Sequence, residues 1–173
     1  MIDYTIEGLY GCTFFQLNFY HEVSEMQIEK SAYAFQLDGN PVSCEEFGHG
    51  HINTTLKITT DTGAEYVLQK INKYVFRNPI RLMSNVSAVT EYLRERVEEP
   101  RMALHFIPTQ KGLYYHRDRK GEFWRMYEFV GGFCMDTPET EDDFYQSAIA
   151  FGRFQQLLSD FPAHTLYETI PEF

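Results

Sequence analysis

The sequence predicts an α+β fold, in which an antiparallel sheet carries a helix, and three observations predict it. Alternating residues at 55–59 and 66–71 flank the turn signal Asp-Thr-Gly at 61–63, which is typical of a β-hairpin. A glycine-containing bend at 47–53 precedes the first of these strands. Apolar residues at helical spacing follow the second strand, at about residues 79–97. A hairpin followed by a helix favours a mixed domain over an all-helical one.

The remaining elements extend this order. The Asn-Pro pair at 78–79 predicts where the helix begins, because Pro suits the first helical turn. Two more strands are expected to meet at a turn within about residues 112–130, and Gly131-Gly132 then leads to a second helix at about 142–159. Glycine loop, basic strand, helix, hairpin, connector and helix follow one another as in the amino-terminal lobe of a protein-kinase-like fold.

These elements divide the chain into three parts. Residues 26–130 are expected to form the lobe, which begins with a short helix at 26–37 that the Asp-Gly-Asn-Pro run at 38–41 ends. Residues 131–173 would form the hinge connector and the start of a truncated carboxy-terminal lobe. Residues 1–25 are an extension that is either an authentic extra strand or helix, or the product of a misplaced start codon.

Five segments carry a family resemblance: GHGHINTTLKI, YVLQKINKYVFRNP, LMSNVSAVTEYLRE, FWRMYEFVGG and FGRFQQLLSDFPAHTLYETIPEF. They resemble the aminoglycoside phosphotransferase/choline kinase superfamily, and more narrowly its N-acetylhexosamine 1-kinase-like members. The resemblance runs from about Glu29 to Phe173. It implies the ATP-binding part of a small-molecule kinase, whose full-length enzyme transfers the γ-phosphate of ATP to a hydroxyl of a sugar or amino-alcohol substrate.

The resemblance also implies that part of the active site lies elsewhere. In that family the catalytic Asp and the metal-binding Asn and Asp follow a segment like the Ile-Pro-Glu-Phe that ends this chain. We therefore expect no catalytic residue and no metal ligand here, with Mg²⁺ held by a carboxy-terminal part. Because phosphoryl transfer depends on positioning and on Mg²⁺, we expect a fragment that is inactive alone. The alternative is a non-catalytic nucleotide-binding or interaction module derived from the lobe.

The glycine loop supplies the first candidate contacts to a nucleotide. Gly48 and Gly50 would let the backbone approach the phosphates, or would only form a tight turn with positive φ. Asn53 and Thr54 would donate to a phosphate, or would satisfy the bend itself. His49 and His51 share one side of an extended chain, but no third ligand is near them in sequence, which argues against a zinc site.

Lys70 is the candidate for the cation that pairs with the phosphates, because a flexible ammonium suits polyphosphate. A solvated lysine at the strand end is the alternative, and a register shift of one residue would make Gln69 the inward side chain instead. By resemblance, Glu91 on the following helix would form an ion pair with the lysine. Otherwise Glu91 is a surface carboxylate paired with Arg94.

The strand that ends at Val130 is expected to lead into a hinge. By resemblance, the backbone of Glu128 and Val130 would recognise adenine, and Gly131-Gly132 would let the chain turn. His116-Arg117-Asp118 matches the His-Arg-Asp of a protein-kinase catalytic loop, but that motif requires an Asn five residues after the Asp, where Phe123 stands. We therefore interpret it as the charged tip of a hairpin.

Composition limits the class of protein further. A formal charge of −10 argues against a nucleic-acid surface, since phosphate backbones require clustered Lys and Arg. No run of eighteen apolar residues occurs, so no membrane span is expected. Cys12, Cys44 and Cys134 show no metal-ligand spacing and are expected as reduced thiols in the cytoplasm.

Overall fold

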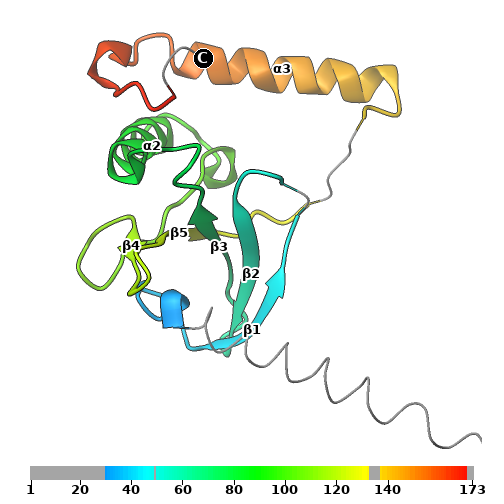
Figure 1. Cartoon of the computed structure of the whole chain (residues 1–173). Helices are drawn as coiled ribbons and strands as arrows, with labels where there is room; N and C mark the ends of the chain where they lie inside the picture. The colour runs from blue at the N-terminus through cyan, green and yellow to red at the C-terminus, as the bar shows by residue number, and fades with distance from the viewer. Residues whose placement is uncertain (1–29, 49, 133–136, 171–173) are drawn as a thin grey trace, which may run out of the picture.

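The computed structural model describes residues 30–48, 50–132 and 137–170 and centres on a five-stranded antiparallel sheet (Figure 1). The strand order is β1-β2-β3-β5-β4. The strands are β1 Pro41–Glu46, β2 Thr54–Thr60, β3 Glu65–Ile71, β4 His116–Arg117 and β5 Phe123–Glu128. The helices are α2 Pro79–Arg94 and α3 Glu141–Leu157, with 3₁₀ turns η1 Pro100–Met102 and η2 Ala163–Thr165. The predicted α+β class is confirmed.

The central hairpin forms where the sequence predicts it. β2 pairs with β3 in register from Thr54↔Lys70 to Thr59↔Glu65, and Gly63 in the turn has φ +84°. Strand β1 is an additional element that the sequence reading did not predict. It is an edge strand in which two of six residues are buried, so it lacks the period-2 alternation that signals a strand.

The sheet has two faces, because successive side chains of a strand point to opposite sides. On the side we call the α2 face, Ile71 clusters with Leu82, Met83 and Phe106, and Phe123 packs against this cluster. On the opposite face, a second cluster joins the sheet to the segment that precedes β1. Its members are Ala32, Phe35, Cys44, Leu56, Ile58, Tyr66, Leu68, Ile107, Trp124 and Met126.

Helix α2 begins as predicted. The Asn78 side chain accepts a hydrogen bond from Arg81 N at 3.0 Å, and Pro79 occupies the first turn. Its buried residues include Leu82, Met83 and Leu93, which confirms the apolar stripe as the face that packs on the sheet. The helix ends at Arg94, a few residues before the predicted end.

Helix α3 lies across the top of the molecule in Figure 1, beyond α2. Thr140 caps it in a capping box with Asp143, yet none of its residues is buried. The segment after α3 returns to α2, where Tyr167 N donates to Asn85 Oδ1 at 2.9 Å and the ring of Phe161 contacts that of Tyr92. Contacts made by this returning segment therefore hold α3 near the lobe.

The start of the lobe differs from the prediction. Residues 30–32 are helical, but Phe35 forms an isolated bridge with Thr109, so the predicted helix at 26–37 does not continue to its expected end. Burial of Phe35 against the sheet outweighs the weak helical pattern there. Residues 1–29, including the predicted extension, lie outside the described residues. No helix in the described part of the chain is long and apolar enough to span a bilayer.

Candidate functional site

The connection between β1 and β2 contains the predicted glycine bend. Phe47 N donates to Thr55 O at 3.0 Å, which closes the connection. Gly48 has φ +80°, a left-handed conformation that favours glycine, so the positive φ expected of a turn glycine is present there. A Cβ built on Gly48 or on Gly50 would meet no atom within 4 Å. The backbone at both glycines therefore faces open space.

Asn53 ties this connection to the end of β3. Its Oδ1 accepts a hydrogen bond from Asn72 N at 2.9 Å, and Asn72 Nδ2 donates to Ile52 O at 3.0 Å. The side-chain oxygen of Asn53 thus accepts a hydrogen bond that holds the bend, as one of the two interpretations from sequence expected.

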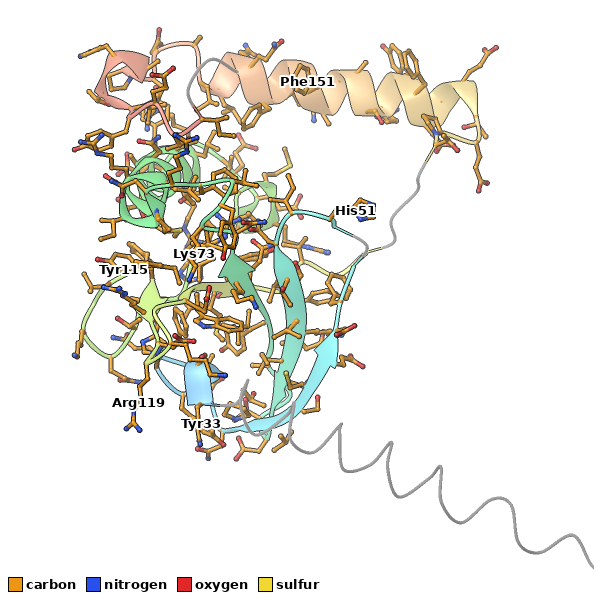
Figure 2. The ribbon with its side chains drawn as sticks, viewed as in Figure 1. Tyr33, His51, Lys73, Tyr115, Arg119 and Phe151 are labelled. Atoms are coloured by element: carbon orange, nitrogen blue, oxygen red, sulfur yellow. The ribbon has the colours of Figure 1, made fainter. Side chains whose placement is uncertain are left out.

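Two adjoining hollows open at this end of the sheet. The first, of about 250 Å³ and called here the glycine hollow, is lined by Glu46, Phe47, Gly48, Gly50, His51, Ile52, Asn53, Thr54 and Thr55. The second, of about 220 Å³ and called the lysine hollow, is lined by Ile52, Thr54, Lys70, Ile71, Asn72, Lys73, Tyr74 and Glu122. They share Ile52 and Thr54. Figure 2 shows His51 in the β1–β2 connection and Lys73 beyond the end of β3. Five predicted site residues are thereby brought together.

The register of β3 separates Lys70 from Gln69. Lys70 and Leu68 share the face of the sheet that lies away from α2. The Nζ of Lys70 lies 5.9 Å from the centre of the Trp124 ring on that face. Gln69 shares the α2 face with Ile71 and stands across from Arg125 on β5. Gln69 therefore faces the side of α2, and Lys70 faces the other side of the sheet.

Glu91 contacts a different partner from the one that the resemblance implies. No ion pair between Glu91 and Lys70 is present in the part of the chain that the structure describes. Burial of Tyr114, followed by the charge of Glu91 and a hydrogen bond to it, raises the pKa of the Tyr114 hydroxyl. Glu91 is exposed, so the structure places it as a surface carboxylate beside Tyr114.

The predicted hinge follows β5 directly. Glu128 N donates to His105 O at 3.0 Å, and Phe129 N donates to Glu65 O at 3.0 Å. The Glu128 carboxylate lies 2.6 Å from His105 Nδ1. Val130 is 44% exposed, and among the backbone bonds of the described residues none uses its amide. A free amide directly after the strand is the group that a hinge would offer to a base.

Arg125 is a candidate that the sequence reading missed. Its Nε and Nη2 both donate to Gln69 Oε1, at 2.9 and 2.6 Å, and Gln69 Nε2 donates to Thr55 Oγ1 at 3.0 Å. Burial lowers the pKa of the Arg125 guanidinium from its usual value. The only signal in sequence is its place between Phe123 and Tyr127, where strand alternation puts three side chains on one face.

The His-Arg-Asp motif forms the hairpin tip that was predicted. Asp118 accepts hydrogen bonds from Lys120 N, Glu122 N and Trp124 Nε1 at 2.8–3.0 Å, so its carboxylate is used to build the turn. Among the described residues, no group of three His, Cys, Asp or Glu side chains is placed to hold a metal ion.

The strand order, α2 against one face and the extended connector after β5 define the amino-terminal lobe of a kinase-like fold. No protein-family model matches the chain. Solved structures with this fold include aminoglycoside phosphotransferase from Alicyclobacillus acidocaldarius subsp. acidocaldarius DSM 446, with a TM-score of 0.58 and 14% identity. Another is amicoumacin kinase hAmiN in complex with AMP-PNP, Ca²⁺ and Ami, with a TM-score of 0.60 and 16% identity.

The two matches cover most of this chain but less than half of each neighbour. The alignment includes 81% of this chain and 37% of the phosphotransferase, and 84% of this chain and 43% of the amicoumacin kinase. The chain thus spans about two-fifths of the length of either structure. At identities this low, the similarity establishes a shared fold.

Proposed function

We propose that this chain is the ATP-binding part of a small-molecule phosphotransferase. The observation that carries the proposal is the lobe itself, because a kinase with the same fold holds AMP-PNP and Ca²⁺ in its structure. In the full-length enzyme the γ-phosphate of ATP would pass to a substrate hydroxyl. The sequence resemblance favours a sugar or amino-sugar 1-kinase, of the N-acetylhexosamine kinase type, among the possible acceptor classes.

The geometry supports an ordered nucleotide-binding site. The Val130 amide and the Glu128 carbonyl would recognise the base, since they lie where β5 ends and the connector begins, as the hinge of a kinase does. The glycine hollow, with Gly48, Gly50 and Thr54 on its walls, would accept the phosphates. Lys70 on the opposite face and Gln69 on the α2 face are the alternative inward residues. Glu91 would pair with the inward residue in the nucleotide-bound state.

A divalent cation would complete such a site. Mg²⁺ bridges phosphate oxygens in kinases and neutralises the charge that develops between them. Its protein ligands are proposed to belong to a carboxy-terminal part, because the resembling family has its metal-binding Asn and Asp there. The role of this chain would then be to hold and orient the nucleotide.

A second candidate function is a non-catalytic interaction module. Helix α3 favours it, because Phe144, Tyr145 and Phe151 are 68%, 61% and 64% exposed, and exposed apolar surface of this kind promotes association. The two functions differ in what they require: nucleotide binding for the first, and a protein partner for the second.

Calorimetric titration of AMP-PNP into the purified chain, with and without Mg²⁺, tests the first function. Saturable binding is expected, with the Mg²⁺ complex bound at least as tightly, because the cation screens the phosphates. Absence of binding at millimolar AMP-PNP in a folded sample would reject the nucleotide-binding function and leave the interaction module.

A further inference from the structure

Arg125 is a partly buried cation without an acidic partner. In the part of the chain that the structure describes, no Asp or Glu side chain forms an ion pair with it. Its hydrogen-bond partner is the neutral amide oxygen of Gln69, which accepts from two of its nitrogens. Taking a guanidinium out of water next to a neutral partner is unfavourable, so buried cations are usually paired with a carboxylate or bind an anion.

Some N–H groups of the Arg125 guanidinium make no hydrogen bond to another described residue. It carries five N–H groups, and the bonds to Gln69 use one on Nε and one on Nη2. Among the described residues, no fully buried side-chain nitrogen or oxygen lacks a hydrogen-bond partner. Nη1 of Arg125 makes no such bond, so solvent must reach it. A ligand that reaches Nη1 from solvent would find two or more N–H donors arranged in a plane, which suits a phosphate.

The position of Arg125 connects it with the glycine hollow. Thr55 lies in the wall of the hollow and accepts from Gln69, and Gln69 in turn accepts from Arg125, so one row of hydrogen bonds crosses three strands on the α2 face. Thr55 is also tied to the glycine bend, because its backbone oxygen accepts a hydrogen bond from Phe47 N at the entry to the bend. From Arg125 to Glu128 the strand advances about 10 Å at roughly 3.3 Å per residue. This spacing separates a site for phosphates from a hinge site for the base.

We propose that Arg125, oriented by Gln69, is the cation that binds the phosphate groups of the nucleotide. The proposal rests on the proposed function and replaces Lys70, which the register of β3 places on the opposite face beside Trp124. Gln69 acts as a positioning residue: its single oxygen holds two nitrogens of the guanidinium and leaves the charge available to an anion. A carboxylate in its place would neutralise that charge internally.

The decisive variant is Gln69→Glu, which keeps the shape and supplies Arg125 with a carboxylate. Titration calorimetry of the full 173-residue chain would use AMP-PNP, adenosine and tripolyphosphate as separate probes. The expected result is a loss of AMP-PNP affinity of about 10- to 100-fold, as for a charge-assisted bond, with adenosine affinity unchanged. Tripolyphosphate binding should weaken in parallel. Gln146→Glu, on the exposed surface of α3, adds the same charge elsewhere and is the matched control.

Stability and a second substitution make the test independent of folding defects. Urea unfolding followed by Trp124 fluorescence should show Gln69→Glu at least as stable as the unmodified chain, because an ion pair replaces a neutral contact. Arg125→Gln, which removes the charge and keeps a hydrogen bond to Gln69, should show the same selective loss of AMP-PNP and tripolyphosphate.

Three results would overturn the proposal, and they are distinguishable. If Gln69→Glu and Arg125→Gln keep full AMP-PNP affinity in folded samples, Arg125 is structural. If Lys70→Met loses AMP-PNP affinity while both other variants keep it, the nucleotide site is real and its cation is Lys70. If the unmodified chain binds neither adenosine nor AMP-PNP, the proposed function itself fails, and this proposal with it.

Discussion

The sheet and helix α3 are built by different forces. Within the lobe, Ile58, Leu68 and Met126 are 0% exposed and belong to one cluster that joins strands far apart in sequence. Helix α3 has good local signals, with a capping box at Thr140 and three acidic residues in its first turn, but no buried residue. One region is stabilised by tertiary burial, and the other mainly by its own sequence.

This difference predicts how the two regions contribute to unfolding. A helix of ordinary length obtains most of its stability from packing of an apolar face, and α3 has such a face without a cover in the described structure. Its contact with the lobe passes through the segment that follows it, where Tyr167 exchanges two hydrogen bonds with Asn85 and stacks its ring on Arg81. The lobe should therefore unfold as one unit, with α3 contributing little to it.

Substitution of one apolar residue in each region tests this contrast most strongly. Leu68→Ala should lower the free energy of unfolding by about 2–5 kcal/mol, because it leaves a cavity in the fully buried cluster. Phe151→Ala, on α3 in Figure 2, removes more atoms but should change it by less than about 0.5 kcal/mol, since the ring is exposed. Urea unfolding followed by the fluorescence of Trp124, the only tryptophan, measures both.

A large effect of Phe151→Ala would contradict this picture. It would mean that α3 is covered in solution, by a second copy or by another part of the chain. Repeating the unfolding at several protein concentrations would separate these cases, because only a second copy makes the midpoint depend on concentration.

Local signals account for what the sequence could predict of the fold. The Asp-Thr-Gly turn, Pro79 at the start of α2 and the turn at Asp118 each depend on a few neighbouring residues, and the structure forms all three. Strand β1 could not be predicted in this way, because an edge strand with mostly exposed side chains carries no alternation. The helix expected up to residue 37 gave way to a long-range bridge between Phe35 and Thr109.

The candidate site was less accessible from sequence, for a related reason. Whether Gln69 or Lys70 faces α2 depends on the register of β3 against β5, and a shift of one residue exchanges the faces. Arg125 became a candidate only when this pairing placed it against Gln69, 56 positions away. The glycine bend, by contrast, is a local feature, and its residues line one hollow.

Two glycine substitutions separate the effect of backbone strain from that of a steric clash in the turns of the lobe. Gly39→Ala should destabilise by about 1–3 kcal/mol, because φ is +87° and the new Cβ would clash with Asp61 Oδ1. Gly63→Ala shares the positive φ but meets no neighbour within 4 Å, so its effect should be smaller. Trp124 fluorescence in urea measures both variants. Equal effects would show that backbone strain alone, without the contact to Asp61, determines the loss.

The cap of α3 can be removed without touching the lobe. Thr140→Ala breaks the hydrogen bond from Asp143 N to Thr140 Oγ1 and should destabilise the helix by about 1 kcal/mol. The helical circular dichroism signal should fall, and the unfolding midpoint reported by Trp124 should stay unchanged. Thr137→Ala, an exposed residue before the helix, is the matched control. A parallel shift of the Trp124 midpoint would show that α3 and the sheet unfold together.

The smallest expected effect is a difference in acid sensitivity between the two regions. Burial acts to raise the pKa of Asp118, but hydrogen bonds from Trp124 Nε1 and the amides of Glu122 and Lys120 outweigh it, so the pKa is lowered. A carboxyl group with a lowered pKa in the folded state stabilises fully above its unfolded pKa of about 3.9, and this contribution is lost as the pH falls below that value. Asp118→Asn should therefore lose less stability than the unmodified chain between pH 7 and pH 3, by a few tenths of a kcal/mol at most, since Asp118 is only partly buried and solvent screens its carboxylate.

Asp160→Asn, in the segment that follows α3, is the control. It should keep the pH dependence of the unmodified chain, because Asp160 makes no hydrogen bond or ion pair among the described residues. If both variants have the same pH dependence, the hairpin at Asp118 does not contribute to the acid sensitivity of the lobe.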